Sequence, residues 1–417
     1  MGGLMIRSSI KKTKIIGILI ILFVIIYFLP FSSSQLSRST SFNIGPQGCV
    51  KPDLSTAPYF IVNKSTYICP GQYDGLYPIK VICSNCFLNC LNSVINQSII
   101  TWNANNIKIM NCNINSDNDS PTGIFLLLTN NSIVKNNNIK FPNLTGDWGG
   151  IEIRENSNSN IIRDNIITGY WIEGSGSYGV RAAWYVTNNT IINNTISGFK
   201  YCISTSLNAA NNTIISNTIS KCEHGIKPYF GSREEKVIGN LVYDTEHDGI
   251  YLVESGILTT KPNNSIISDN IVYNSHNCIR IESSETTNPQ VKNNLLSNCE
   301  EGISVFPIFF AKIDSDALIT NNTIFNNTHS GIMILSVNGV LVYHNNLIDN
   351  MVQAIDGGIR NKWNNSNIGN FWYNYNDSSE GCFDRNLDGI CDSPFPVLAE
   401  NGSIKTYDYL PSVKPFM

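Results

Sequence analysis

A repeated pattern of asparagine and isoleucine runs along most of this chain. Each unit has an asparagine beside a pair of isoleucines, then a second asparagine and a further isoleucine, as in Asn160–Ile166 and Asn189–Ile196. The last apolar residue of each unit recurs every 22 to 30 residues. These positions are Ile114, Ile139, Ile166, Ile196, Ile219, Leu241, Ile271, Leu295, Ile324, Leu347 and Phe371. A period of this size is typical of a solenoid, in which each repeat stacks on its neighbours.

The composition of each unit predicts strands rather than helices. The units are short, β-branched and bounded by turn residues. A second short apolar run follows and usually begins with Gly-Ile or Cys-Ile, as at Gly225-Ile226 and Cys278-Ile279. The Leu-X-X-Leu-X-Leu frame of leucine-rich repeats is absent from the sequence. We therefore expect an all-β parallel β-helix of about 11 to 13 coils, with one layer every ~4.8 Å.

Two columns of inward residues should form the core. The first contains Ile166, Ile196, Ile219 and Ile271, and the second contains Ile151, Ile203, Ile226, Ile250 and Ile303. Asparagine tolerates left-handed turns, and stacked asparagine amides can hydrogen-bond from layer to layer. The many asparagines are therefore expected at the corners of the coils.

Residues of about 60 to 412 resemble right-handed parallel β-helix proteins of the NosD-like, pectin-lyase-like kind. The resemblance rests on the repeat, the Gly-Ile runs and the tail Gly369-Asn370-Phe371-Trp372 and Asp388–Pro396, which is similar to the ending of archaeal surface β-helix proteins. It implies a right-handed solenoid. It does not define one function, because this fold hosts lyases, epimerases, glycosidases, adhesins and accessory proteins.

The first 35 residues indicate export. Basic residues precede an apolar run from Ile15 to Leu29, which is the pattern of a signal peptide or an uncleaved N-terminal membrane anchor. We expect residues 1–35 to be this signal or anchor, 36–60 a linker and N-terminal cap, 61–372 the β-helix, and 373–417 a C-terminal cap. The protein would then be secreted or anchored at the cell surface, outside the cytoplasm. The net charge is −4 without a basic cluster, so nucleic acid is not an expected partner.

Twelve cysteines agree with an oxidising compartment. Cys202 and Cys278 each open a strand, and Cys222 and Cys299 each lie in the turn that leads to the equivalent strand of the next coil. Cys202–Cys222 and Cys278–Cys299 are therefore expected to form disulfides, as is Cys382–Cys391. The six N-terminal cysteines include Cys83-X2-Cys86, which could be a zinc motif or part of a disulfide-linked cap; a second regular ligand pair is missing. Fourteen Asn-X-Ser/Thr sequences are potential glycosylation sites, although an Asn-Thr repeat produces them by chance.

An acidic loop near the C-terminus could bind calcium. Asp384, Asn386, Asp388 and Asp392 carry oxygen ligands at alternating positions around Gly389. The position that holds glutamate in an EF-hand is Phe395, so an EF-hand is excluded. The alternative is a solvated acidic turn held by the neighbouring disulfide. Calcium is the one expected cofactor, and no organic cofactor is expected.

Residues that follow the inward isoleucines should form a polar row on the outside of the solenoid. From Glu152 to Asp356 they include Arg181, Ser204 and Met333, and the acids and bases gather on consecutive coils. The candidate catalytic residues are Glu223, Lys227, His247, Asp248, Tyr251 and Arg280. Enzymes that act on uronic sugars need a base for the C5 proton, an acid, and cations for the carboxylate. We expect Asp248 to orient His247.

Aromatic residues crowd one end of this row and could stack on sugar rings. The candidate carbohydrate-binding residues are Trp148, Trp171, Trp184, Tyr201 and Tyr229. The expected partner is thus an extracellular polysaccharide or glycoprotein, which the protein binds and, if it is an enzyme, modifies by lyase, epimerase or glycosidase chemistry. A non-catalytic stalk or adhesin would also suit this face, and the family resemblance further implies a copper-site accessory protein. Five scattered histidines give little support to copper.

Overall fold

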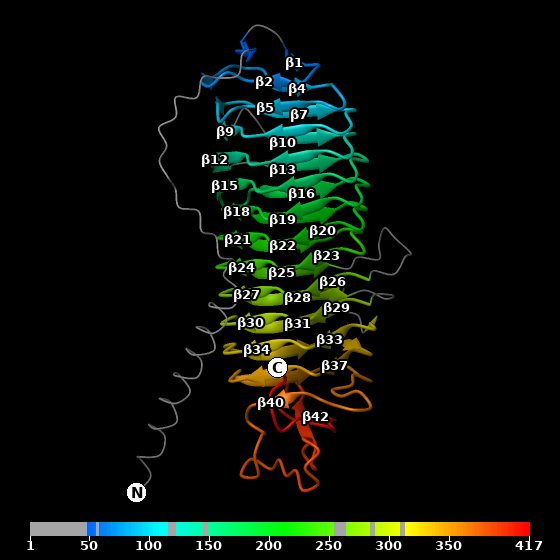
Figure 1. Ribbon diagram of the computed structural model, residues 1–417. Coiled ribbons are helices and arrows are strands. Elements are labelled where there is room, and N and C mark those ends of the chain that lie inside the picture. The colour runs from blue at the N-terminus through cyan, green and yellow to red at the C-terminus, as the bar shows by residue number, and fades with distance from the viewer. Residues whose placement is uncertain are drawn as a thin grey trace, which may run out of the picture. The chain divides into compact units, whose positions relative to one another are not determined.

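The structure is a computed structural model that describes residues 48–55, 58–115, 122–144, 149–253, 264–283, 288–308 and 313–417. These residues belong to one compact unit, Gly45–Met417. The unit is a right-handed parallel β-solenoid of about 12 coils, as the repeat predicts. The coils are stacked in chain order (Figure 1). The expected signal or anchor segment lies outside the described residues, in which we find no helix long and apolar enough to cross a membrane.

Each complete coil contributes one strand to each of three parallel sheets. The first sheet contains β1 (Phe60–Val62), β4 (Ile79–Val81), β7 (Ile99–Trp102), β10 (Thr122–Leu127), β13 (Gly149–Arg154), β16 (Tyr178–Ala183), β19 (Tyr201–Ser206), β22 (His224–Pro228), β25 (Asp248–Val253), β28 (Asn277–Ser283), β31 (Glu301–Pro307), β35 (Ser330–Ile334), β39 (Val352–Asp356), β41 (Phe395–Leu398) and β42 (Ile404–Asp408).

The second and third sheets are built mostly from the Asn-Ile units. The second sheet contains β2 (Thr66–Tyr67), β5 (Phe87–Asn89), β8 (Lys108–Met110), β11 (Ile133–Lys135), β14 (Ile161–Arg163), β17 (Thr190–Ile192), β20 (Thr213–Ile215), β23 (Lys236–Ile238), β26 (Ile266–Ser268), β29 (Gln290–Lys292), β33 (Leu318–Thr320) and β37 (Leu341–Tyr343). The third contains β3 (Gln72–Tyr73), β6 (Val94–Ile95), β9 (Asn113–Asn115), β12 (Asn138–Leu144), β15 (Ile166–Trp171), β18 (Thr195–Ser197), β21 (Thr218–Ser220), β24 (Leu241–Tyr243), β27 (Ile271–Tyr273), β30 (Leu295–Ser297), β34 (Thr323–Phe325), β38 (Asn346–Ile348) and β40 (Phe371–Trp372). A separate pair joins β32 (Ile313–Asp314) to β36 (Val337–Asn338).

The core column of the first sheet agrees with the sequence prediction. Ile151, Ile203, Ile226, Ile250 and Ile303 are all fully buried. They lie in one column of paired positions, in which Ile203 pairs with Ile226 and Ile226 pairs with Ile250. The predicted Ile face of this sheet is therefore confirmed.

The predicted column of the third sheet is wrong by one residue in two of its four coils. Ile196 and Ile219 are buried, but Ile166 is 51% exposed while its neighbour Ile167 is 0% exposed and pairs with Ile196. Likewise, the buried residue of β27 is Val272 rather than Ile271. These units contain two adjacent apolar residues. Since successive side chains of a strand point to opposite faces, only one of each pair can enter the core.

At the corner between the second and third sheets, the first asparagine of a pair turns the chain and the second hydrogen-bonds to the next layer. Asn193 adopts a left-handed conformation with φ of 54°, which turns the chain. The next residue, Asn194, is buried, and its side-chain amide donates to Asn217 in the following layer at 3.0 Å. Asn217 donates to Asn240 in the same way. This ladder satisfies amides that would otherwise be buried without partners.

The asparagine ladder ends on a carboxylate in the C-terminal cap. Asn370 donates its backbone N–H to Asp408 at 2.7 Å, and the Trp372 indole donates to the same oxygen at 2.9 Å. Asp408 ends β42, which pairs antiparallel with β41. Burial raises the pKa of Asp408 to about 6, against the opposing effect of these hydrogen bonds. The cap therefore completes the hydrogen bonding of the last coil.

All twelve cysteines form disulfides. The structure contains the three pairs expected from the repeat, Cys202–Cys222, Cys278–Cys299 and Cys382–Cys391. The N-terminal cysteines pair as Cys49–Cys69, Cys83–Cys86 and Cys90–Cys112. The zinc interpretation of Cys83 and Cys86 is thus wrong, since both thiols are used in one bridge. Six disulfides indicate an oxidising, extracytoplasmic compartment.

Candidate functional site

The outer face of the first sheet carries a row of polar and aromatic side chains, which we call the outer row. Register pairing aligns Glu152 with Arg181 and Ser204 with Lys227 in neighbouring layers. The row continues through Tyr251, Arg280, Ser304 and Met333. The prediction that Asp356 ends this row is wrong, because Ile355 pairs with Met333. The Asp356 side chain points inward and accepts a hydrogen bond from the buried Trp363 indole.

The position two residues before the inward isoleucine forms a second column of side chains from coil to coil. His224 and Ile226 are separated by Gly225, and strict alternation would place both on the same face. His224 instead packs against Tyr201 and Tyr251, with ring centroids 5.5 and 5.4 Å away. The small residue between them is essential. A Cβ on Gly225 would lie 2.4 Å from the Gly249 carbonyl oxygen and 2.6 Å from Val242.

This local irregularity brings His224, rather than His247, to Asp248. The Nδ1 atom of His224 lies 2.8 Å from Asp248, and its Nε2 atom lies 3.3 Å from Glu223. His247 is exposed at the edge of the cluster, with its ring 5.7 Å from that of His224. The expectation that Asp248 orients His247 is therefore wrong, because Asp248 is directed across the layers and not back along its own strand.

Asp248 is held by a chain of contacts that crosses four layers. Asn277 donates to its other carboxylate oxygen at 2.8 Å, and the Ser304 hydroxyl donates to the side-chain oxygen Oδ1 of Asn277 at 2.8 Å. Burial is the largest single influence and raises the pKa of Asp248, but the contacts with His224, Arg280 and Asn277 together outweigh it and leave the pKa below its usual value. Burial lowers the pKa of His224, although Asp248 opposes this. An ionised Asp248 beside a neutral imidazole is the arrangement that follows near neutral pH.

Lys227 lies among three tyrosines. Its ammonium is 4.4 Å from the Tyr251 ring centroid, 4.8 Å from that of Tyr201 and 5.7 Å from that of Tyr229. Such cation–π contacts are favourable when the cation is partly desolvated. Burial lowers the pKa of Lys227 to about 8, while Asp248 and Glu223 favour the charged form. The ammonium is thus charged at neutral pH and close to losing its proton above it.

Tyr251 and Arg280 complete this part of the row. The Arg280 guanidinium lies 5.0 Å from the Tyr251 ring and contacts Glu282 at 2.5 Å. Burial and the neighbouring Glu282 raise the pKa of Tyr251, so its hydroxyl keeps its proton at neutral pH. The structure therefore gathers the predicted Glu223, Lys227, Asp248, Tyr251 and Arg280 around His224 on one face.

The candidate aromatic residues do not all lie at this face. Tyr201 and Tyr229 contact Lys227, and Tyr229 also hydrogen-bonds Tyr178 through their hydroxyls at 3.2 Å. Trp184 is exposed in a left-handed turn just after β16, whereas Trp171 ends β15 in the third sheet. Trp148 lies outside the described residues. Sequence reasoning missed Asn277 and the central place of His224.

Histidines and acids also gather further along the chain, in the turns that lead into β28, β31 and β35. His276 contacts Glu300 at 2.7 Å, and His329 contacts Glu301 at 3.2 Å. Burial raises the pKa of Glu301. In the described part of the chain, no group of three or more His, Cys, Asp or Glu side chains is placed to hold a metal ion.

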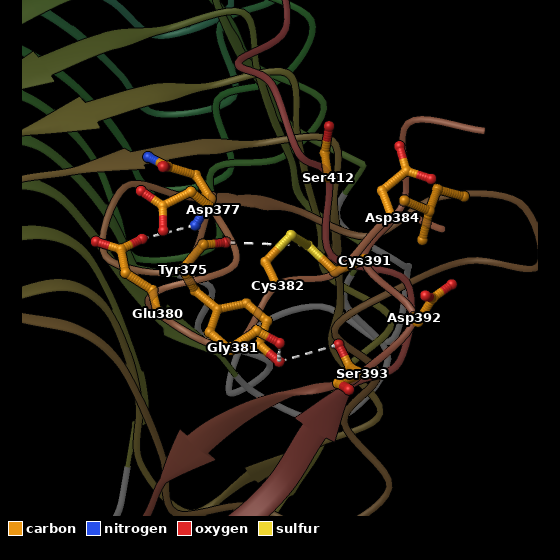
Figure 2. The surroundings of a disulfide bond; sticks show 12 residues. Tyr375, Asp377, Glu380, Gly381, Cys382, Asp384, Cys391, Asp392, Ser393 and Ser412 are labelled. Atoms are coloured by element: carbon orange, nitrogen blue, oxygen red, sulfur yellow. Dashed lines mark hydrogen bonds between the residues drawn. A yellow bond between two sulfur atoms is a disulfide. The ribbon is translucent and has the colours of Figure 1, made fainter. Parts of the chain in front are cut away.

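The acidic C-terminal loop is a compact turn beside the last disulfide. Asp384 accepts the backbone N–H groups of Asp388 and Gly389 at 3.1 and 3.0 Å, and Asp392 accepts that of Arg385 at 3.2 Å. Beside the Cys382–Cys391 bridge, the Tyr375 hydroxyl hydrogen-bonds the carbonyls of Gly381 and Ser393 (Figure 2). The fourth residue of the expected calcium set, Asn386, donates to Asp388. These contacts are those of an acidic turn, and calcium stays a prediction.

Comparison with known proteins defines the class. Residues 143–295 match the model for a right-handed beta helix region, and residues 254–377 match that for the periplasmic copper-binding protein NosD. The solenoid is that of a right-handed parallel β-helix protein, and these matches make the chain similar to the NosD-like, pectin-lyase-like group. No curated protein sequence matches the chain significantly.

Solved structures share the fold at low sequence identity. The A-module of the mannuronan C-5 epimerase AlgE6 of Azotobacter vinelandii is 11% identical, with a TM-score of 0.53 over 74% of this chain and 91% of its own. The Dettilon tailspike protein is 15% identical, with a TM-score of 0.52 over 70% of this chain and 61% of its own. A mutant tailspike protein of E. coli bacteriophage HK620 is 10% identical, with a TM-score of 0.51 over 72% and 68%. These similarities establish the fold alone.

Proposed function

We propose that this protein binds an acidic extracellular polysaccharide along the outer face of the first sheet and abstracts a proton from it. The observation that carries this proposal is the arrangement of His224 between Asp248 and Tyr251, beside the ammonium of Lys227. A base, a proton donor and cations are the groups that proton removal from the C5 atom of a uronic sugar requires.

The cluster supplies each group from a different layer. With Asp248 ionised, the 2.8 Å contact favours the imidazole proton on Nδ1 and leaves the lone pair on Nε2. Glu223 lies 3.3 Å from Nε2, so its carboxylate would have to move aside for Nε2 to reach the sugar and act as the base. Lys227 and Arg280 would hold the sugar carboxylate, which withdraws charge from the C5 carbon as its proton leaves for Nε2. Tyr251 keeps its proton and would donate it, either to the opposite face of that carbon in an epimerase or to the departing glycosidic oxygen in a lyase.

The flat rings of Tyr201 and Tyr229 supply the apolar surface on which a sugar ring would stack. A mannuronan epimerase module on the same fold is consistent with this chemistry, although 11% identity transfers no residue role. Secretion, or retention at the surface by the N-terminal segment, would place the protein where such polymers occur.

A polysaccharide panel tests this function. Acidic and neutral polymers are passed over the immobilised full-length protein, and eluted polymers are analysed for unsaturated ends and for changed C5 configuration. Retention of acidic polymers with either product supports the proposal. Retention without any product leaves a binding protein. If no polymer is retained or changed, the outer row is a solvated face and a role as a stalk or adhesin stands.

A further inference from the structure

From β16 to β28 the outer row carries a cation in every second layer. Arg181 is on β16, Lys227 on β22 and Arg280 on β28, and the order of the sheet places β19 and β25 between them. The intervening positions are Ser204 and Tyr251, and Ser304 follows Arg280. Neutral and positive side chains therefore alternate over these five layers, which follow the acidic Glu152 of β13.

The spacing of these cations follows from the geometry of the sheet. Neighbouring parallel strands are ~4.8 Å apart, so cations two layers apart recur roughly every 10 Å. This distance is comparable to the length of an extended β-linked disaccharide. A polysaccharide lying along the solenoid axis would therefore place one disaccharide over each pair of layers.

Each cation has capacity left for a ligand. The ammonium of Lys227 contacts tyrosine rings. The Arg181 side chain is 13% exposed and lies 3.8 Å from Glu152, which is beyond hydrogen-bonding distance. The Arg280 side chain is 32% exposed and contacts Glu282. The Nε atoms of both arginines are buried, so a ligand would bind their terminal N–H groups. A guanidinium has five N–H donors, so both arginines can share a further carboxylate.

Tyrosines separate the cations and cover their flanks. Tyr178 lies under the Arg181 guanidinium at 4.4 Å, and its ring is 5.2 Å from that of Tyr201. Tyr251 lies between Lys227 and Arg280, at 4.4 and 5.0 Å from them. The face thus alternates charge with flat apolar surface. This pattern complements a polymer in which acidic and uncharged sugars alternate.

Resting on the proposed function, we infer that the ligand is a polysaccharide with one carboxylate per disaccharide, bound along the solenoid axis. A polymer with a carboxylate on every sugar would place alternate carboxylates over Ser204 and Tyr251, where no cation meets them. Its unmatched charges would lose water without gaining a partner.

Two polymers of glucuronate separate these possibilities. Hyaluronan oligosaccharides carry glucuronate on alternate sugars, and polyglucuronate of equal chain length carries it on every sugar. Carboxyl-reduced hyaluronan serves as the uncharged control. Affinities of the full-length protein are measured by calorimetry at constant ionic strength, since exposed charges are screened by salt.

We expect hyaluronan to bind about tenfold more tightly than polyglucuronate, and the reduced polymer to bind weakest. The substitutions Arg181→Gln, Lys227→Gln and Arg280→Gln should each weaken hyaluronan binding by about tenfold. The matched control Arg163→Gln removes a half-exposed cation of the second sheet, where Arg163 pairs with Asp164, and should leave affinity unchanged. Circular dichroism verifies that each variant is folded.

Equal or tighter binding of polyglucuronate would overturn the inferred spacing and leave the proposed function intact. A loss of affinity in Arg163→Gln equal to that in the three outer-row variants would also overturn it, because the attraction would then be diffuse. If neither acidic polymer binds, while other acidic polymers of the panel also fail, the proposed function falls and the inferred ligand with it.

Discussion

The Nδ1 atom of His224 lies 2.8 Å from the carboxylate of Asp248, one layer further along the solenoid. The two residues lie on different strands, β22 and β25, which belong to consecutive coils. The contact exists because the coils stack in register, with His224 paired to Asp248. A parallel solenoid can thus bring together a His–Asp pair from residues 24 positions apart.

Replacing Asp248 with asparagine should separate catalysis from binding. The amide removes the negative charge that fixes the imidazole proton on Nδ1, while Asn277 can still hydrogen-bond the side-chain oxygen. We expect turnover to fall by at least about 100-fold with little change in affinity for the polymer. Steady-state kinetics and calorimetry on the same preparation measure both quantities. His247→Asn is the control, and an equal loss of turnover in that variant would return the role to His247.

Turnover should follow a bell-shaped pH profile. The acid limb reports His224, whose pKa burial places below its usual value, because only the neutral imidazole accepts a proton. The alkaline limb reports Lys227, whose pKa is about 8, because the neutral amine no longer holds a carboxylate. Lys227→Arg should move the alkaline limb upward, since a guanidinium stays charged. An alkaline limb near 8 that persists in this variant would contradict the assignment.

Glu235 should make the protein less stable as the pH rises. This residue stands in an asparagine ladder, where it accepts from Asn212 and Ser232 at 3.0 Å each, and burial raises its pKa from 4.5 to about 8. The folded state binds the proton more tightly than the unfolded state, so its stability falls between about pH 4.5 and 8.

Glu235→Gln should therefore raise the melting temperature at pH 8 and flatten its pH dependence in this window. We expect a gain of about 1 to 3 kcal/mol at pH 8. Thermal melts across this pH range, with the exposed Glu155→Gln as control, measure it. A variant that is less stable than the native protein at pH 8 would show that the buried carboxylate is stabilised by its ladder partners.

The corrected core column has a direct test. Ile167→Asp buries a charge without a partner and should prevent folding, at a cost of several kcal/mol. Ile166→Asp places the same charge on the exposed neighbour and should be tolerated. Secretion yield and circular dichroism compare the two variants. Equal damage by both substitutions would contradict the inward orientation of Ile167.

The calcium prediction concerns Asp384, Asn386, Asp388 and Asp392. An ion that binds only the folded state stabilises it by about 2.7 kcal/mol at 100 times its Kd. The melting temperature should therefore be higher in calcium than in chelator, and Asp388→Asn should remove the difference. Identical melts of the native protein in both conditions would leave only the hydrogen-bonded turn.

The sequence was sufficient for the fold, because the Asn-Ile period defines the stacking and the cysteines repeat with it. It was ambiguous where two apolar residues are adjacent. Thr195-Ile196 has one residue that suits the core, whereas Ile166-Ile167 has two, and only the register decides between them. The pairing of Asp248 with His224 was hidden for a related reason. The irregularity at Gly225 reverses the alternation on which the assignment of outward residues depended.

Deuterium exchange at C5 tests the proposed proton abstraction most directly. The full-length protein is incubated in heavy water with a uronic polysaccharide that it retains, and the recovered polymer is examined by proton NMR for deuterium at C5. An epimerase removes this proton and returns one from solvent, so it must leave deuterium at C5, whereas a lyase removes the proton as it forms the double bond. We expect one of these two outcomes with the native protein, and a rate lower by at least about 100-fold with Asp248→Asn. A retained polymer whose C5 protons neither exchange nor disappear through elimination would contradict the account.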